Sequence, residues 1–381
     1  MPQRLASTTL ALALIGSAAA AQDSTAVRDT SAAAVDSIRQ LVPTPDTIRG
    51  LYVNRWAAIS PRMWELVGIA KSTEVNALVI DVKDDRGFML YRSSVPLARE
   101  IGADTTNPMP LRRLRALMDT LRLHGVYPIA RIVVAKDPLL AAARRDLAIR
   151  RRDDTSTVWL DRDGNPWLDP TRDEIWRYAA DIGREAAWLG FSEIQYDYVR
   201  FPDEDRVIRE GRYAQMASRS RAQVIRDQLT LVREATSDLG VPMAIDVFGL
   251  TATDSTDMGI GQQWEMFIDR ADVVLPMNYP SHFARGTYGL AHPNAQPYET
   301  VNQALKDAVN RSAGIEGAAK IIPWLQDFSM GRPRYGADQL RAQMRAAYDN
   351  GIPDWILWNP ASRYTEDALM PAEPVTAPST P

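Results

Sequence analysis

Short apolar segments alternate along the chain with longer segments of helical character. Runs of five to eight mostly apolar residues are typical of strands that are buried on both faces. We expect strands at residues 49–56, 77–83, 127–134, 193–199, 242–248, 273–279, 319–325 and 354–358. We expect helices at residues 61–73, 111–124, 171–189, 214–239, 261–270, 297–311 and 337–350. The alternation predicts an α/β fold, a (β/α)8 or TIM barrel that forms a single domain over residues 48–365.

An open, doubly wound sheet is the alternative arrangement of such a pattern. That fold often binds a nucleotide through a Gly-x-Gly-x-x-Gly motif after its first strand. No such motif follows residues 49–56, and eight strands are enough to close a barrel. The pattern therefore favours the barrel.

The two ends of the chain differ in composition from its middle. Residues 1–21 combine an early arginine, an apolar run at 10–15 and the small residues Ala19 to Ala21, a pattern typical of a secretory signal peptide. Residues 22–47 are predicted to form a flexible linker, and residues 366–381 a disordered, proline-rich tail. We therefore expect an exported protein, periplasmic or secreted, without a membrane anchor once the signal peptide is cleaved.

Composition excludes several classes of function. A net charge of −4 gives no basic footprint for nucleic acid. The chain has no cysteine, which excludes disulfides, thiolate zinc sites and cysteine nucleophiles. Three histidines are few for a zinc hydrolase. There is no Gly-x-Ser-x-Gly motif to support a serine hydrolase, and we expect no cofactor.

Polar side chains recur near the C-terminal ends of the expected strands, where a barrel carries its active site. They are Asn54, Arg55, Asp81, Lys83, Asp84, Arg131, Asp197, Arg200, Asp246, Asn278, Tyr279, Gln326, Asp327 and Asn359. Asp197 is the most unusual of them, because it lies inside an apolar run and carboxylates are rarely buried without a partner. Asp81 and Lys83, two positions apart, either neutralise each other or bind substrate. Arg131 either holds a neighbouring carboxylate ionised or contacts substrate.

Aromatic residues at strand ends and in the following loops suggest the class of substrate. They are Trp56, Trp167, Tyr198, Tyr279, Trp324 and Trp358. Aromatic faces beside carboxylates suit carbohydrate, since rings stack on the apolar faces of sugars while acids hydrolyse the glycosidic bond. That reaction needs two carboxyl groups, and Asp197, Asp246 and Asp327 are the candidates.

Seven segments carry a resemblance to a known family: Val79–Gly87, Tyr127–Pro138, Glu193–Pro202, Asp246–Gly249, Leu275–Phe283, Pro323–Phe328 and Leu357–Pro360. With these segments the chain resembles a family of barrel-type glycoside hydrolase domains. It is more distantly similar to the α-amylase-like glycosidase barrels.

The more distant similarity implies a role for each carboxylate. Asp197 would be the nucleophile, Asp246 the acid/base and Asp327 the stabiliser of the transition state. This chain departs from that pattern in having aspartate on strand five, where those enzymes have glutamate, and Gln195 where they have arginine. Asp81, Asp84 or Glu265 are the other candidates for the acid/base.

The sequence thus predicts an exported glycoside hydrolase whose carbohydrate substrate contacts a defined set of side chains. That set is Asp81, Lys83, Arg131, Tyr198, Arg200, Asn278, Tyr279, Trp324, Trp358 and Asn359. Two alternatives stay open. One is a barrel that binds carbohydrate without cleaving it, and the other is a metal-dependent hydrolase using Asp81, Asp197 and Asp246. A second carboxylate close to Asp197 distinguishes hydrolysis from binding.

Overall fold

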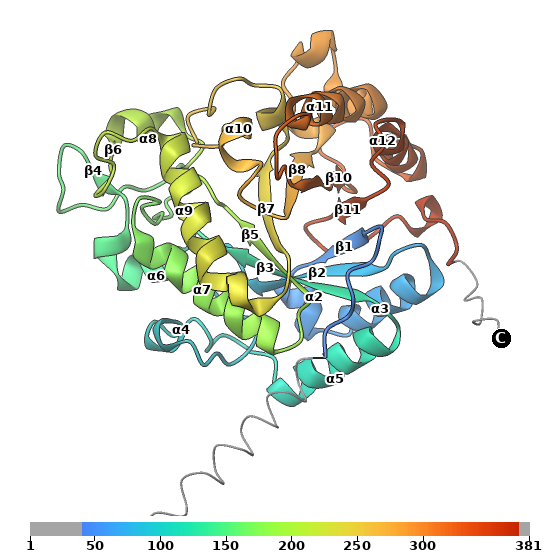
Figure 1. The fold of residues 1–381 in the computed structure, drawn as a ribbon, viewed down its shortest axis with the longest axis horizontal. Coiled ribbons are helices and arrows are strands. Elements are labelled where there is room, and N and C mark those ends of the chain that lie inside the picture. Colours follow the sequence, from blue (N-terminus) through green and yellow to red (C-terminus); the bar gives the residue numbers. More distant parts are fainter. Residues whose placement is uncertain (1–39, 373–381) are drawn as a thin grey trace, which may run out of the picture. The chain divides into compact units, whose positions relative to one another are not determined.

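The computed structural model describes residues 40–372 as strands enclosed by helices (Figure 1). The barrel strands are β1 (Arg49–Val53), β2 (Ala77–Lys83), β3 (Tyr127–Val133), β5 (Glu193–Asp197), β7 (Met243–Phe248), β8 (Val273–Asn278), β10 (Trp324–Gln326) and β11 (Trp355–Trp358). Their order is β10-β11-β1-β2-β3-β5-β7-β8, and β8 pairs with β10. Every one of these pairings is parallel. The predicted (β/α)8 barrel is therefore confirmed.

The strand predicted at residues 319–325 is broken into two pieces. Its first piece, β9 (Lys320–Ile321), pairs with the start of β8, and β10 pairs with the end of β8. Pro323 lies between the two pieces. Proline has no N–H to donate to a ladder of strands, so the interruption is expected at this residue.

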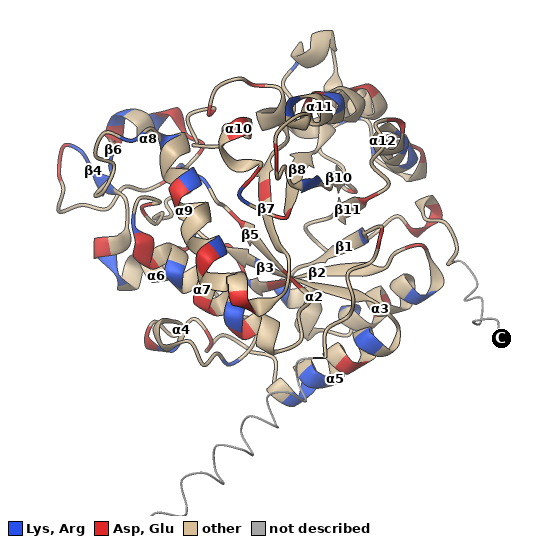
Figure 2. Cartoon of the chain, in the orientation of Figure 1, with Lys and Arg blue, Asp and Glu red and all other residues tan. Residues whose placement is uncertain are grey.

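Helices cover the outer face of the strands (Figure 1). The long ones are α3 (Arg62–Ser72), α5 (Leu111–Leu123), α7 (Asp173–Trp188), α9 (Arg221–Thr236), α11 (Pro297–Ser312) and α12 (Ala337–Asp349). The short ones are α2 (Arg55–Ile59), α4 (Pro96–Glu100), α6 (Pro138–Ala143), α8 (Asp205–Glu210) and α10 (Trp264–Phe267). Acidic and basic residues are interspersed on α5, α7 and α9 (Figure 2).

Two helix predictions were too long. The helix predicted at 214–239 begins at Arg221, because the Ser220 side chain accepts from the Gln223 N–H and the Gln223 side chain accepts from the Ser220 N–H. Such a capping box fixes the first turn of a helix. The helix predicted at 261–270 is reduced to the four residues of α10. Between β3 and α9, β4 (Arg150–Arg151) and β6 (Gly211–Arg212) form a small antiparallel pair.

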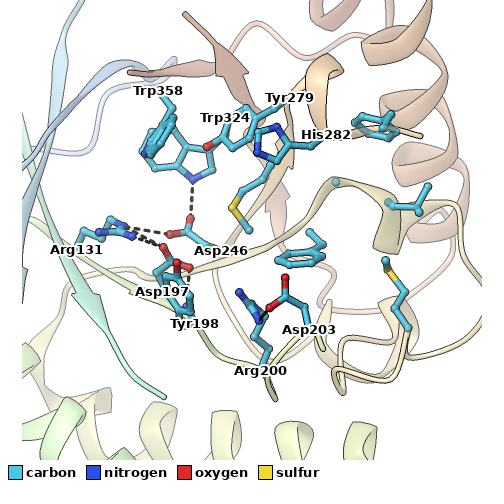
Figure 3. Close-up of a pocket in the computed structure, with 16 residues that line it drawn as sticks. Arg131, Asp197, Tyr198, Arg200, Asp203, Asp246, Tyr279, His282, Trp324 and Trp358 are labelled. Carbon is cyan, nitrogen blue, oxygen red and sulfur yellow. Dashed lines mark hydrogen bonds and ion pairs between the residues drawn. The ribbon is translucent and has the colours of Figure 1, made fainter. Parts of the chain in front are cut away.

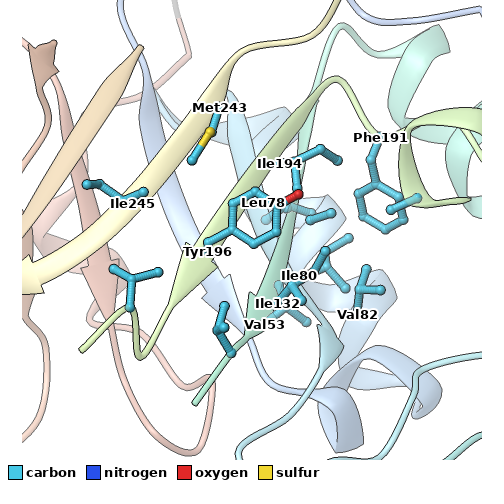
Figure 4. Packing of buried hydrophobic residues seen from close by; sticks show 14 of the residues in the cluster. Val53, Leu78, Ile80, Val82, Ile132, Phe191, Ile194, Tyr196, Met243 and Ile245 are labelled. Atoms are coloured by element: carbon cyan, nitrogen blue, oxygen red, sulfur yellow. The ribbon is translucent and has the colours of Figure 1, made fainter. Parts of the chain in front are cut away.

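Side chains alternate between the two faces of each barrel strand, and both faces are buried. The outward cluster packs under the helices and includes Ile80, Ile194 and Ile245 (Figure 4). The inward cluster fills the barrel and includes Val79 and Ile129. This alternation directs Asp197, three positions after Ile194, into the barrel.

The packed structure extends beyond residues 48–365 on both sides. Val42 is buried, and its N–H donates to the Ser192 hydroxyl at 2.9 Å. Leu369 is also buried, and Pro371 forms a bridge with Thr73. Single buried apolar residues thus anchor short stretches on both sides of residues 48–365 to the barrel.

The predicted signal peptide at 1–21 and most of the predicted linker and tail lie outside the described residues. Within residues 40–372, no helix combines the length and the apolar character that crossing a membrane requires.

Candidate active site

A pocket of about 510 Å³ opens at the C-terminal ends of the barrel strands (Figure 3). Its lining residues are Arg131, Asp197, Tyr198, Arg200, Asp203, Asp246, Phe248, Gly249, Leu250, Met258, Met277, Tyr279, His282, Phe283, Trp324 and Trp358. They come from β3, β5, β7, β8, β10, β11 and the segments that follow these strands. Seven of the residues predicted to bind or react with substrate thus converge on one cavity with Asp197: Arg131, Tyr198, Arg200, Asp246, Tyr279, Trp324 and Trp358.

Arg131 of β3 joins three carboxylates. Its Nε and Nη2 donate to Oδ2 of Asp197, the Nε bond measuring 3.0 Å. Its Nη1 donates to Oδ1 of Asp81 at 2.6 Å, and Nε lies 3.8 Å from Oδ2 of Asp246. The four side chains are almost fully buried, so their charges interact without much screening by water. Arg131 therefore binds neighbouring carboxylates directly, and its positive charge lowers the pKa values of Asp81 and Asp246 that burial raises.

Asp197 is held by backbone as well as by Arg131. Its Oδ1 accepts the N–H of Tyr198 at 2.5 Å, while Oδ2 faces Arg131. Tyr198 has φ of +55°, in the left-handed region that costs a residue with a Cβ about 1 kcal/mol or more. Strain of this kind persists where surrounding structure enforces it, and it is concentrated at functional sites. Here it accompanies a fixed orientation of the Asp197 carboxylate.

Asp246 of β7 is in a different electrostatic environment. Burial, followed by the negative charge of Asp197, raises its pKa well above the usual value. Arg131 lowers the pKa, as do hydrogen bonds to Oδ1 from Trp324 Nε1 and Gln195 Nε2, each 2.7 Å long. Among the described residues, Oδ2 of Asp246 has no hydrogen-bond partner. The burial effect dominates, which favours a protonated Asp246 beside Asp197.

The two carboxyl groups are close enough to act on one bond. The Oδ2 atoms of Asp197 and Asp246 lie 3.0 and 3.8 Å from the same Nε atom of Arg131. They are therefore no more than about 7 Å apart, which lies below the upper limit of roughly 9.5 Å for the paired acids of glycosidases. Asp246 is thus a second carboxyl group close to Asp197.

The three clustered aspartates do not form a metal site. In the described part of the chain, no group of three or more acidic or histidine side chains is arranged to hold a metal ion. Asp81, Asp197 and Asp246 instead surround the guanidinium of Arg131, which supplies the positive charge at their centre. The alternative of a metal-dependent hydrolase therefore does not fit these residues.

Aromatic rings form one wall of the pocket. Trp358 stacks on Tyr52 with ring centroids 5.8 Å apart, and Tyr279 lies 5.5 Å from Trp358. Trp324 lies nearly perpendicular to Tyr52, and its N–H donates to Asp246. Apolar ring faces beside carboxyl groups suit a sugar ring, whose two faces carry C–H groups. Trp56, by contrast, is 44% exposed and is not among the lining residues.

Lys83 was predicted to share a strand face with Asp81, and this was wrong. The pairing of β2 with β3 shifts between Asp81 and Lys83, so that Lys83 leaves the inward face. Its Nζ forms a buried ion pair of 2.6 Å with Asp137 instead. A bulge re-aims the side chains that follow it, which period-two reasoning does not anticipate.

Four other predicted residues are likewise absent from the pocket lining, namely Asp81, Asp327, Asn359 and Asn278. Asp81 lies behind Arg131 and accepts the Tyr52 hydroxyl at 2.6 Å, and burial raises its pKa to about 6. Asp327 accepts the N–H and the hydroxyl of Thr365. Asn359 donates to the Asp327 carbonyl. These two residues come after the end of their strands, and they fasten the C-terminal segment to the barrel.

Asn278 points away from the barrel interior, since it follows the inward Met277 on β8. It packs against Gly249, where an added Cβ would lie 2.6 Å from Asn278 Oδ1. The two further acid/base candidates are also remote from the pocket lining. Asp84 pairs with Arg55, and Glu265 pairs with Arg311.

Several contributors were missed from the sequence. Gln195 lies two positions before Asp197, so strand alternation alone could have placed it on the same inward face. Tyr52 is inward on β1 by the same rule. His282 follows β8 and lines the pocket, and burial lowers its pKa, which leaves the imidazole neutral near pH 7. Met277, Phe248 and Phe283 add apolar surface.

The closed parallel barrel with paired acids in its mouth places the chain among barrels of the glycoside hydrolase type. Residues 50–364 match the model of a family described as "Putative glycosyl hydrolase domain". The chain belongs to this family. None of the proteins with a curated functional description matches the chain.

Two solved structures agree with the fold, and a third is similar in sequence. The PgaB (BpsB) glycoside hydrolase domain from Bordetella bronchiseptica is 13% identical, with a TM-score of 0.60 over 84% of this chain and 95% of that one. The α-L-fucosidase isoenzyme 2 from Paenibacillus thiaminolyticus is 13% identical, with a TM-score of 0.54 over 84% of this chain and 47% of that one. A hypothetical protein from Ruminiclostridium thermocellum ATCC 27405 is 32% identical, with a TM-score of 0.46 over 52% of this chain and 97% of that one.

Proposed function

We propose that this protein is an exported glycoside hydrolase that cleaves an oligo- or polysaccharide with Asp246 as acid/base and Asp197 as nucleophile. The observation that carries the proposal is the position of both carboxyl groups on the single guanidinium of Arg131, at the floor of the pocket. Two carboxyl groups in different protonation states are what glycosidic hydrolysis needs.

The first step breaks the bond between the anomeric carbon and the glycosidic oxygen. Asp246 gives its proton to that oxygen as the leaving group departs, and Asp197 attacks the anomeric carbon to form a glycosyl-enzyme. In the second step Asp246, now ionised, takes a proton from water. The water oxygen attacks the same carbon, and Asp197 is released as a carboxylate.

The surrounding residues support both steps. Arg131 orients Asp197 by donating to one of its carboxylate oxygens, and the Tyr198 N–H donates to the other. Trp324 and Gln195 fix one oxygen of Asp246 and leave the other unbonded among the described residues, where it can carry the transferred proton. The wall of Tyr279 and Trp358 offers stacking surface for the sugar.

The experiment is a screen of purified protein against bacterial and plant polysaccharides, with reducing-sugar release as the readout. Asp197→Asn and Asp246→Asn should each abolish release while their circular dichroism stays that of the wild type. Asp327→Asn is the matched control, since it makes the same change in a buried carboxyl group outside the pocket lining. A glycan that the wild type binds but never cleaves would contradict hydrolysis and favour a carbohydrate-binding barrel.

Export is proposed from the pattern of residues 1–21 and has its own test. Expression of the full chain in a bacterium should yield a mature protein in the periplasm or medium that starts near residue 22. Full-length protein confined to the cytoplasm would contradict this part of the proposal.

A further inference from the structure

Arg200 lies in the pocket wall, three residues after Asp197, and the proposed mechanism does not use it (Figure 3). Only 6% of the residue is exposed. Its guanidinium is enclosed by the rings of Tyr198, Phe248 and Trp167, whose centroids lie 4.7, 4.6 and 5.1 Å from Cζ. Phe248 follows Asp246 by two positions, so Arg200 lies between the strand ends that carry the two acids.

The hydrogen bonds of this guanidinium involve only one of its three nitrogen atoms. Within residues 40–372, Nη1 alone donates, to the Phe201 carbonyl and to Oδ1 of Asp203, both at 3.1 Å. The Nε and Nη2 donors make none of the hydrogen bonds found in this part of the chain, and they are not sealed in the protein interior. Together they form one planar edge with two parallel N–H groups, the geometry that matches a carboxylate.

The protein's own carboxylate neutralises Arg200 only weakly. The Asp203 side chain is 49% exposed at the rim of the pocket, and ion pairs with solvent-exposed partners contribute little. The two donors that no protein group accepts can form charge-assisted hydrogen bonds with an anion that enters the pocket. The hydrogen bond to the Phe201 carbonyl uses Nη1 alone. A purely structural role for Arg200 therefore does not explain the edge formed by Nε and Nη2.

Other charges in the pocket do not compete for this role. Arg131 forms ion pairs with three aspartates. Burial lowers the pKa of His282, which keeps its ring neutral. Lys136 lies 5.3 Å from the centroid of the Tyr198 ring, pairs with Asp85 and is not among the lining residues. Among the lining residues described, Arg200 is thus the permanent cation with donors to spare.

We propose that Arg200 binds the carboxylate of a uronic acid, and that the substrate is an acidic glycan with such a sugar next to the bond that is cleaved. The inference rests on the proposed glycosidase function and specifies its substrate class. The three rings around the guanidinium hold it in the pocket wall, and a carboxylate on the sugar would supply the acceptor that Nε and Nη2 lack.

The test measures binding and cleavage separately. Binding of D-glucuronate and D-galacturonate is compared with that of D-glucose and D-galactose by titration calorimetry or ligand-observed NMR. Cleavage is compared on glucuronan and polygalacturonate and on the same polymers after chemical reduction of their carboxyl groups. The reduced polymers keep the linkage and lose only the charge, so they are matched controls.

The wild type should prefer uronates and unreduced polymer, and Arg200→Gln should reduce that preference roughly 10- to 150-fold, the range for one charged hydrogen-bonded contact. Arg200→Lys should restore only part of it, because lysine lacks the fork. Asp203→Asn changes an exposed residue that poses little risk to folding. It should tighten uronate binding and leave neutral sugars unaffected, since it removes the competing carboxylate.

Equal binding of uronates and neutral sugars by the wild type would overturn the proposal, as would an Asp203→Asn variant with unchanged uronate affinity. Cleavage of neutral glycans alone, unaffected by Arg200→Gln, would overturn this inference and leave the glycosidase function intact. Uronate binding that depends on Arg200, without cleavage of any glycan, would uphold the site and contradict the glycosidase function.

Discussion

The indole Nε1 of Trp324 donates a hydrogen bond of 2.7 Å to Oδ1 of Asp246. The bond reaches from β10 past β8 to β7, and it stabilises the charged form of the acid, thereby lowering a pKa that burial has raised. The proton affinity of the proposed acid/base is thus set by two opposing influences. A tryptophan that composition would assign to sugar stacking also tunes the catalytic group.

Removing a donor from Asp246 should move the alkaline limb of the pH–rate profile. Gln195→Met deletes the second hydrogen bond to Oδ1 and keeps similar volume. The pKa of Asp246 should rise further, so the protonated acid persists to higher pH and the alkaline limb shifts upward. The pH dependence of kcat/KM measures this. A limb that stays in place or moves downward would show that Asp246 is not the proton donor.

Glu193 should make stability depend on pH. It is buried at the start of β5, and burial raises its pKa to about 8, although the hydrogen bond from Tyr127 lowers it. The folded protein therefore keeps a proton that the unfolded chain loses near pH 4.5, so the free energy of unfolding falls as pH rises from about 4.5 to about 8. The slope is at most about 1.4 kcal/mol per pH unit.

Glu193→Gln removes this titration. Urea unfolding of both proteins between pH 5 and pH 9 should give curves that diverge with rising pH, the variant becoming the more stable. Parallel curves across the range would refute the assignment.

Asp327 should matter for stability and not for catalysis. Both its carboxylate oxygens bind Thr365, which fastens the segment after β11 to the barrel. Asp327→Asn should lower the free energy of unfolding by roughly 1 to 3 kcal/mol, the cost of disturbing a buried hydrogen-bonded group. Its kcat/KM should stay within about threefold of the wild type. A loss of a hundredfold or more would return Asp327 to the catalytic set.

A double-mutant cycle can measure how strongly the buried charges of Lys83 and Asp137 stabilise each other. Lys83→Met leaves Asp137 uncompensated and should cost roughly 3 to 5 kcal/mol of stability. Adding Asp137→Asn should recover part of this loss, because the charge is removed while the side-chain oxygen can still cap α6 at Leu140. Additive losses would mean that the two charges do not stabilise each other.

The sequence predicted the barrel because every strand is a short apolar run followed by a helix or loop of recognisable pattern. It also placed Asp197, Asp246 and Arg131 correctly at strand ends, since parallel strands of a barrel present those ends on one face. It failed for Lys83, where a bulge in β2 breaks the alternation. It failed again for Asp327 and Asn359, because residues just past a strand follow the loop.

The central claim is that Asp246 protonates the leaving group while Asp197 attacks. The most direct measurement compares Asp246→Asn with the wild type on two glycosides of the same sugar, one with an alkyl alcohol and one with an acidic phenol as leaving group. The account predicts a loss of about a hundredfold or more for the alkyl glycoside, which needs the proton, and a much smaller loss for the aryl glycoside, which does not. Equal losses on both substrates, or no loss on the alkyl glycoside, would contradict it.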